Sequence, residues 1–160
     1  MGVQGNCLGG GLELVLGCGI VIAEESAKLG CPEIQLGVLP PAATALLGAQ
    51  GKSRLAEDIL LTGRTLRTDE AKAVGIVNAV APDGELDATI DAYVGQHFLA
   101  RSASSLRIAT AAIRESYAAD VDARLAAAER AYLEELLPTH DGVEGIQAFI
   151  DKRSPAWSDK

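Results

Sequence analysis

The 160-residue sequence has few basic residues, few cysteines and no long apolar run, and each shortage excludes a class of function. Its 14 lysines and arginines are outnumbered by 22 acidic residues, which gives a net charge of −8 and a pI near 4.7. Because nucleic-acid binding depends on basic contacts to phosphates, this balance argues against DNA or RNA as the main partner. A phosphorylated small ligand stays compatible with it, since helix ends and a few local cations can bind one.

The three cysteines, Cys7, Cys18 and Cys31, are odd in number and form no C-x-x-C pair. They predict buried thiols in a reducing compartment, and with only two histidines the sequence contains no metal-binding pattern. Residues 12–23 are apolar but short, contain glycines and carry Glu13, so we expect no membrane span. The first residues lack the basic segment of a secretory signal, and we expect a cytoplasmic protein.

The rest of the sequence is organised around the stretch Cys7-Leu8-Gly9-Gly10-Gly11-Leu12-Glu13-Leu14. Three consecutive glycines are costly inside a helix or strand, but they suit a sharp turn that brings bare N–H groups to a ligand. An apolar helix is expected to follow, and its unpaired amides at the positive end of the helix dipole predict an anion site. Glu13 falls about one turn into this helix, where it can face the same pocket.

A second carboxylate follows in Cys31-Pro32-Glu33-Ile34-Gln35-Leu36-Gly37. Amides for a developing oxyanion together with two carboxyl groups form a workable set for proton transfer next to a carbonyl. The pattern alone leaves simpler alternatives open, namely a tight packing turn at the glycines, a dipole-stabilised acid at Glu13 and a surface acid at Glu33. The apolar neighbours of Glu13 favour its burial, and a buried carboxylate needs a reason. A dinucleotide-binding fingerprint is disfavoured because its third glycine would fall at Leu14.

The element pattern changes near Pro82, from glycine-rich mixed α/β to alanine-rich helix. In the first part we expect strands at 20–23, 28–30 and 76–80, and helices at 11–18, 42–47, 52–61 and 68–75, the last capped by Thr68. Pro41 is expected to be the first-turn proline of the element that contains 42–47. In the second part we expect helices at 85–100, 102–117, 121–137 and 141–152, the last opening with the capping-box spacing of Asp141 and Glu144. These patterns predict a core over 1–82 and a helical assembly region over 83–160.

Five short segments carry a resemblance through their order and spacing. They are Gly9-Gly10-Gly11-Leu12-Glu13-Leu14, Pro32-Glu33-Ile34-x-Leu36-Gly37, Leu61-Thr62-Gly63, Ala71-x-x-x-Gly75-Ile76-Val77 and Glu144-Gly145-x-x-Ala148-Phe149-x-x-Lys152-Arg153. The series resembles the crotonase family, the enoyl-CoA hydratases and isomerases, from Val3 to the C-terminus. The resemblance implies an α/β fold, the crotonase-like β-β-α spiral (ClpP/crotonase), N-terminally incomplete and with a C-terminal helical region, because the match covers only the later part of a usual member.

The same resemblance implies roles for single residues. Gly10 matches the residue whose backbone N–H is one of two donors to the thioester oxygen. Glu13 and Glu33 match the two carboxylates that hydrate the double bond, one activating water and the other passing a proton to the α-carbon. The implied substrate-binding residues are Gly9, Gly11, Pro32, Leu36, Phe149 and Lys152, of which the last two belong to a helix that can meet the CoA nucleotide. No metal or other cofactor is implied, since coenzyme A is part of the substrate.

The implied function is a hydro-lyase that adds water to an α,β-unsaturated acyl-CoA. The segments Cys7-Leu8, Ala27-Lys28-Leu29-Gly30 and Pro41-Ala42-Ala43 resemble cyclic dienoyl-CoA hydratases, which favours an alicyclic dienoyl thioester. An enoyl-CoA isomerase or acyl-CoA hydrolase of the same family is an alternative. A second alternative is a truncated or split subunit without turnover of its own, because the other oxyanion donor belongs to the N-terminal part of the family pattern. We expect a homo-trimer or hexamer, or a partner chain that supplies this part, and neither nucleic acid nor membrane as partner.

Overall fold

The computed structural model describes the backbone of residues 1–160 and every side chain except that of Ser116. Within this description six short strands form two three-stranded sheets, in the orders β1-β3-β6 and β2-β4-β5. Neighbouring strands pair in parallel except β4 and β5, which are antiparallel. The strands are β1 Gly2–Val3, β2 Asn6–Leu8, β3 Ile22–Glu24, β4 Lys28–Gly30, β5 Thr65–Arg67 and β6 Ala79–Ala81. Successive strands therefore alternate between the sheets up to β4, as a spiral requires.

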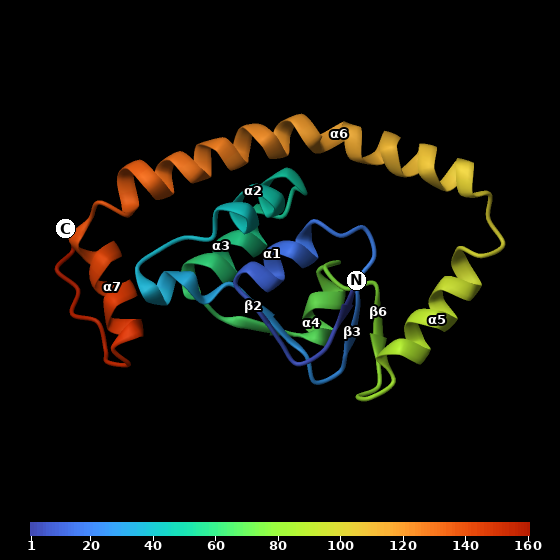
Figure 1. Cartoon of the computed structure of the whole chain (residues 1–160), viewed down its shortest axis with the longest axis horizontal. Coiled ribbons are helices and arrows are strands. Elements are labelled where there is room, and N and C mark those ends of the chain that lie inside the picture. Colours follow the sequence, from blue (N-terminus) through green and yellow to red (C-terminus); the bar gives the residue numbers. More distant parts are fainter.

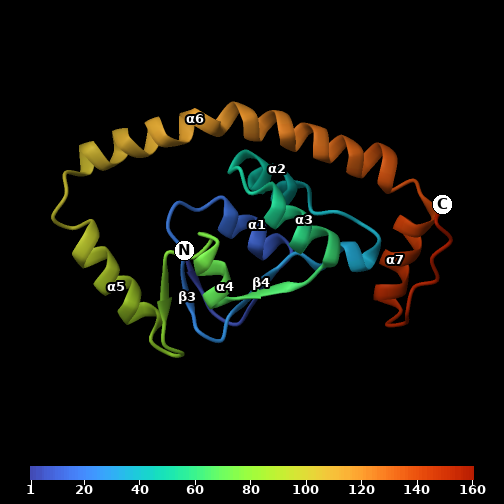
Figure 2. The same ribbon diagram turned by 180° about the vertical axis from the view of Figure 1, so that it is seen from behind.

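The helices pack beside the sheets and then extend beyond them (Figure 1). The α-helices are α1 Gly10–Leu16, α2 Pro41–Ala49, α3 Ser53–Thr62, α4 Thr68–Ala73, α5 Leu86–His97, α6 Ala103–Arg130 and α7 His140–Ile150. A 3-10 helix, η1, covers Pro32–Leu36, and a π-helix, η2, continues α6 over Ala131–Leu136. Figures 1 and 2 show α6 arching over the core, with α5 and α7 at its two ends.

The hydrophobic core joins α1 to α4 with strands of both sheets, and its members run from Val3 to Val77. Leu12, Leu29 and Leu47 are completely buried in it. Burial of a leucine stabilises the fold by about 1.5–3 kcal/mol, so these side chains hold α1, β4 and α2 firmly together. The helix that follows the glycine turn, and the strand β4 that pairs with the strand before it, are therefore anchored in one core.

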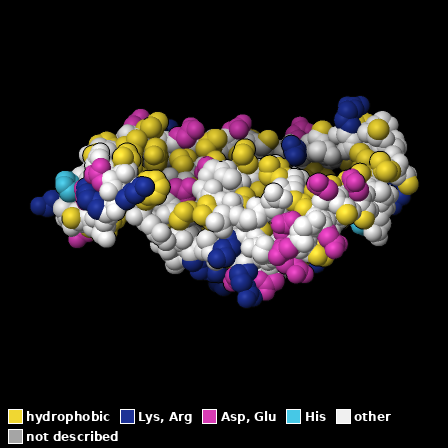
Figure 3. Space-filling model, turned by 60° about the horizontal axis from the view of Figure 1, so that its bottom comes forward, with side chains coloured by type: hydrophobic (Ala, Val, Ile, Leu, Met, Phe, Trp, Pro, Cys, Tyr) yellow, Lys and Arg dark blue, Asp and Glu magenta, His cyan; other side chains and the backbone are white. Residues whose placement is uncertain are grey.

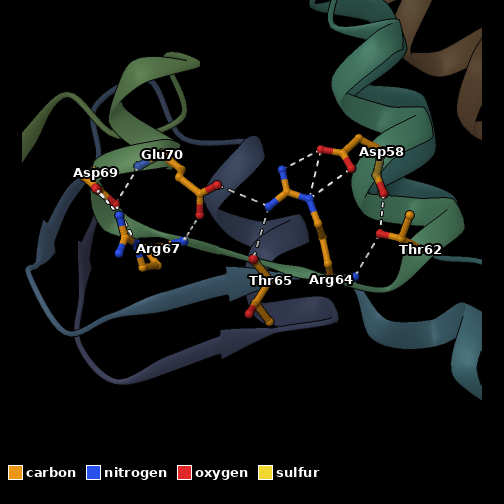
Figure 4. A network of polar contacts seen from close by, with 7 residues as sticks. All are labelled: Asp58, Thr62, Arg64, Thr65, Arg67, Asp69 and Glu70. Carbon is orange, nitrogen blue, oxygen red and sulfur yellow. Dashed lines mark hydrogen bonds and ion pairs between the residues drawn. The ribbon is translucent and has the colours of Figure 1, made fainter.

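A polar network lies over the connection from α3 through β5 to α4 (Figure 4). The guanidinium of Arg64 donates to both carboxylate oxygens of Asp58, with Nε at 2.9 and 3.0 Å, and to Glu70 Oε1 at 3.3 Å. The other oxygen of Glu70 accepts from the backbone N–H of Arg67 at 3.0 Å. Hydrogen bonding from Arg64 lowers the pKa of the Asp58 carboxyl. Because these side chains are partly exposed, the network orients the connection more than it stabilises it.

Three predicted features of the helices are wrong. Thr68 does not cap α4, because its buried hydroxyl donates instead to the carbonyls of Glu24 at 2.6 Å and Ala27 at 3.1 Å. The helices expected over 102–117 and 121–137 are one continuous helix, α6 with η2. No glycine or proline interrupts residues 117–121, and an ion pair one turn apart, Asp120 with Arg124 at 2.9 Å, spans the expected break.

The third wrong feature is the capping box of α7. The N-cap of this helix is Thr139, whose hydroxyl accepts from the N–H of Gly142 at 2.9 Å. Asp141 is the second residue of the helix and lies two positions past the N-cap, so its carboxylate does not cap α7. It binds backbone N–H groups near the C-terminus instead. The strand expected over 76–80 is also shifted, since β6 begins at Ala79.

The surface carries charges of both signs. On the face in Figure 3, acidic and basic side chains gather together at the lower edge, and hydrophobic side chains are spread above them. Among the described helices, none combines the length and the apolar character that crossing a bilayer requires.

Candidate active site

The glycine turn follows β2 directly and is hydrogen-bonded to β4, the strand that pairs with β2. Gly9 has a φ of +56°, a left-handed conformation that favours glycine, and its N–H donates to the carbonyl of Gly30 at 2.8 Å. Its own carbonyl accepts from the N–H of Glu13 at 3.1 Å and from the thiol of Cys31 at 3.8 Å. Gly10 is the exposed first residue of α1, and the first amides of a helix have no acceptor within it. The turn is thus held rigidly with amides at its surface.

Glu13 lies in the first turn of α1 and is half-buried. Its Oε1 accepts from the backbone N–H of Ala43, in the first turn of α2, at 3.0 Å. Its Oε2 lies 4.0 Å from the position that a Cβ on Gly10 would take. One oxygen is therefore tied to α2, while the other faces the glycine turn.

Glu33 approaches the same turn from η1, which begins at Pro32 directly after β4. Its Oε1 lies 2.7 Å from the position that a Cβ on Gly9 would take, so only glycine leaves room for this carboxyl. Its Oε2 is buried and has no hydrogen-bond partner among the described residues. Burying a polar oxygen without a partner is costly, and such atoms in native structures call for an explanation, for example a bound group.

The electrostatics of this cluster favour a protonated acid. Burial raises the pKa of Glu33, and the nearby negative charge of Glu13 raises it further, against the effect of a hydrogen bond from its own backbone N–H. The pKa of the Cys31 thiol rises to about 12, because of burial first and then the charges of Glu33 and Glu13. Cys31 therefore stays neutral and serves as a hydrogen-bond donor to the turn, whereas Glu33 can hold a proton.

The structure brings four of the predicted site residues together, namely Gly9, Gly10, Glu13 and Glu33. The other predicted residues lie around or away from this cluster: Gly11 next to the Cys7 sulfur, Pro32 and Leu36 in η1, exposed Phe149 in α7 and exposed Lys152 just beyond it. Among the described contacts, none brings Phe149 or Lys152 to the carboxylates.

Two participants were missed from the sequence, Ala43 and Cys31. Ala43 contributes only a backbone N–H, which no side-chain pattern reveals. The available signal was Pro41, which is predicted to start a helix and therefore places free amides in the first turn. Cys31 is predicted to be a buried thiol, but its bond to the Gly9 carbonyl depends on the pairing of β2 with β4.

The comparisons with known proteins show which family the chain belongs to. The sequence profile of the family described as Enoyl-CoA hydratase/isomerase matches residues 2–160. The chain belongs to the enoyl-CoA hydratase/isomerase family. It is 40% identical over 158 residues to the cyclohexa-1,5-dienecarbonyl-CoA hydratase of Thauera aromatica, covering 99% of this chain and 60% of that protein. It is 37% identical over 155 residues to the 2,3-dehydroadipyl-CoA hydratase of Escherichia coli, covering 96% of this chain and 60% of that protein.

Solved structures of enoyl-CoA hydratases agree with this family membership. An enoyl-CoA hydratase from Mycobacterium avium subsp. paratuberculosis superimposes with a TM-score of 0.85 at 30% identity, over 98% of this chain and 65% of that one. The crotonase-like fold predicted from the sequence is therefore confirmed. This family member spans about 60% of the length of the curated relatives it matches.

Proposed function

We propose that the chain carries the carboxylate half of a hydratase site that adds water to an α,β-unsaturated acyl-CoA. The observation that carries this proposal is the buried Glu33 Oε2, which has no partner among the described residues and belongs to a carboxyl that, like Glu13, lies beside the glycine turn. In the proposed site, the water that adds to a thioester bound at this turn supplies the missing partner. Family membership supports the same reaction class.

In the proposed reaction the two acids have opposite tasks. Glu13 acts as the base: it takes a proton from water as the water oxygen bonds to the β-carbon, and the π electrons move toward the thioester carbonyl. Glu33 acts as the acid and passes its proton to the α-carbon. The raised pKa of Glu33 supports this division, because a carboxyl must be protonated to deliver a proton. Proton return from Glu13 to Glu33 through solvent completes the cycle.

The charge that develops on the thioester oxygen needs hydrogen-bond donors. The proposed donor from this chain is the backbone N–H of Gly10, an exposed residue at the start of α1, as the family pattern implies. A fixed donor of this kind is worth about 3 kcal/mol in the transition state, or roughly a hundredfold in rate. Gly9 and Gly11 serve by letting the backbone approach the substrate closely, and Pro32 and Leu36 by forming the η1 wall.

The proposed substrate is an α,β-unsaturated thioester of coenzyme A, with an alicyclic dienoyl group favoured. The relative named cyclohexa-1,5-dienecarbonyl-CoA hydratase supports this choice. We assign Phe149 and Lys152 to contacts with the CoA nucleotide. No other cofactor enters the proposed reaction. Three cysteines without a disulfide fit the reducing cytoplasm as the place of action.

The proposed division of labour gives residues 1–82 the site and residues 83–160 the assembly and CoA contacts. Exposed apolar side chains in the C-terminal region support assembly, since Leu99 between α5 and α6 is 77%, Ile108 58% and Leu133 61% exposed. We propose a homo-trimer or hexamer, or pairing with a polypeptide that corresponds to the remaining length of the relatives. The latter is the alternative of a split subunit.

The test is hydration of crotonyl-CoA and of cyclohexa-1,5-dienecarbonyl-CoA, followed by NMR of the product. We expect a hydroxyacyl-CoA product from both substrates, and we expect it to form faster from cyclohexa-1,5-dienecarbonyl-CoA than from crotonyl-CoA. Activity of the chain alone excludes the split-subunit alternative, whereas activity only after adding the remaining 40% of a relative as a separate polypeptide supports it. A product with a shifted double bond and no added water indicates the isomerase alternative. Release of free CoA indicates the hydrolase alternative. Absence of hydration in both preparations contradicts the proposal.

A further inference from the structure

The last residues of the chain, 153–160, form a tail that folds back onto α7, and Figure 1 places the C-terminus beside this helix. The carboxylate of Asp141 accepts from the backbone N–H groups of Ser158 and Asp159, both at 2.8 Å, and from the Ser158 hydroxyl at 3.0 Å. These hydrogen bonds lower the pKa of Asp141, so its carboxylate is ionised and binds the tail at neutral pH. Charge-assisted bonds of this kind are stronger than neutral ones.

A second carboxylate of α7 holds the beginning of the same tail. Glu144 accepts from the Arg153 guanidinium at 2.5 and 2.8 Å and from the backbone N–H of Ala156 at 2.8 Å. The pKa of Glu144 falls to about 2, mainly through its hydrogen bond with Arg153. The tail is thus attached to α7 at both ends, and the residue between these attachments is Trp157.

Helix α7 in turn lies directly against η1, backbone to backbone. A Cβ built on Gly145 would lie 2.1 Å from the carbonyl oxygen of Leu36, the last residue of η1. A Cβ built on Gly37 would lie 2.8 Å from the carbonyl oxygen of Asp141. Only two glycines permit so close an approach, so any change in the position of α7 is transmitted to η1.

Trp157 covers this contact between α7 and η1 next to both glycines. Its indole Cζ3 lies 3.1 Å from the Cβ position of Gly37, and its Cη2 lies 2.9 Å from that of Gly145. The ring therefore touches both backbones at the point where they meet. It is 46% exposed, so it covers the contact from the solvent side.

The opposite side of η1 is held by the end of α3. The Gln35 side chain donates from Nε2 to the carbonyl of Gly63 at 3.3 Å. At the end of η1, the N–H of Gly37 donates to the backbone carbonyl of Ile34 at 3.1 Å. The N–H of Val38 donates to the backbone carbonyl of Glu33 at 3.2 Å. Because a single 3-10 turn has few and poorly aligned hydrogen bonds, its position depends on these flanking contacts.

We infer that Trp157, held by Asp141 and Glu144, is a positioning residue for Glu33. By covering the contact between α7 and η1 it fixes η1 and so keeps the Glu33 carboxyl beside Gly9. The catalytic part of this inference rests on the proposed function, whereas the placement of Glu33 does not. A displacement of about 1 Å at a reacting group can cost a hundredfold in rate, so a residue at the chain end can matter for chemistry.

The test compares Trp157→Ala with Trp157→Phe and with Ile150→Ala, a matched change of an apolar α7 residue that is 66% exposed. Three quantities are measured: hydrogen exchange at the Val38 N–H, the pKa of Glu33 by ¹³C NMR of its carboxyl, and kcat with KM for crotonyl-CoA. The first two need no turnover, so they decide the positioning role even if the chain is inactive.

In Trp157→Ala we expect faster exchange at Val38, a Glu33 pKa closer to its ordinary value, and kcat about tenfold lower with KM within about twofold. In Trp157→Phe we expect the exchange at Val38, the Glu33 pKa and kcat to stay close to those of the unaltered chain. In Ile150→Ala we expect none of these quantities to change. An unchanged Val38 exchange and an unchanged Glu33 pKa in Trp157→Ala overturn the inference. Should Trp157→Ala unfold, Asp141→Asn provides the second variant: its tail release is read from the fluorescence of Trp157, the sole tryptophan, and must be accompanied by the same change in Glu33.

Discussion

Glu33→Gln and Glu13→Gln are each expected to lower the hydration rate by about 10²–10⁴-fold, the usual contribution of a general acid or base. The amide keeps the size of the carboxyl but can neither accept nor deliver the proton. Because Oε1 of Glu13 only accepts from Ala43, its amide counterpart can preserve that bond, and the fold survives. Binding of the CoA thioester is expected to change by less than about threefold, since neither acid is assigned to binding in the ground state.

The two variants are separated by exchange of the α-hydrogen in deuterated water. Glu33→Gln is expected to lose this exchange, because Glu33 is the proposed donor to the α-carbon. The matched control is Glu57→Gln, which changes an exposed acid of α3 and leaves the rate unaltered. Near-normal turnover in either active-site variant removes that carboxylate from the mechanism, and loss of thioester binding reassigns it to the binding of substrate.

Gly145→Ala is expected to destabilise the chain by about 3 kcal/mol, at the upper end of what overpacking usually costs. The added methyl would lie 2.1 Å from the carbonyl oxygen of Leu36, and backbone cannot move away as a flexible side chain can. Helix α7 must therefore separate from η1. The first measurement is the free energy of unfolding of the chain from urea denaturation. The second measurement is the melting of α7.

The control for this prediction is Gly95→Ala, the same change within helix α5. Nothing lies within 4 Å of a Cβ on Gly95, so the substitution gains helix propensity, about 1 kcal/mol, without a clash. The two variants are thus expected to shift stability in opposite directions. Equal effects of the two substitutions contradict the close contact between α7 and η1.

Local signals predicted the parts of the fold that depend on local conformation. The three glycines located the turn before α1, Pro41 located the start of α2, and β4 was predicted over the residues that form it, 28–30. The first two follow from a backbone preference that one or two residues impose, namely a left-handed φ at glycine and a fixed φ at proline. The ordered series of motifs then gave the family, which the profile match confirms.

What the sequence did not predict depends on partners far along the chain. The hydroxyl of Thr68 prefers two carbonyls more than 40 residues away, and the Asp141 carboxylate prefers the tail over its own helix. Helix η1 is held by α3 and α7, neither of which adjoins it in sequence. The roles of Phe149 and Lys152 in CoA binding stay predictions, because they require a bound ligand.

The central claim is that Glu13 and Glu33 share one site, so that the charge on one acts on the other. The direct measurement is the pKa of Glu33, from ¹³C NMR of its carboxyl, in the unaltered chain and in Glu13→Gln. Burial and the Glu13 charge both raise this pKa, so it should exceed the ordinary glutamate value and fall when Glu13 becomes neutral. An ordinary pKa in the unaltered chain, or one that Glu13→Gln leaves unchanged, contradicts the shared site.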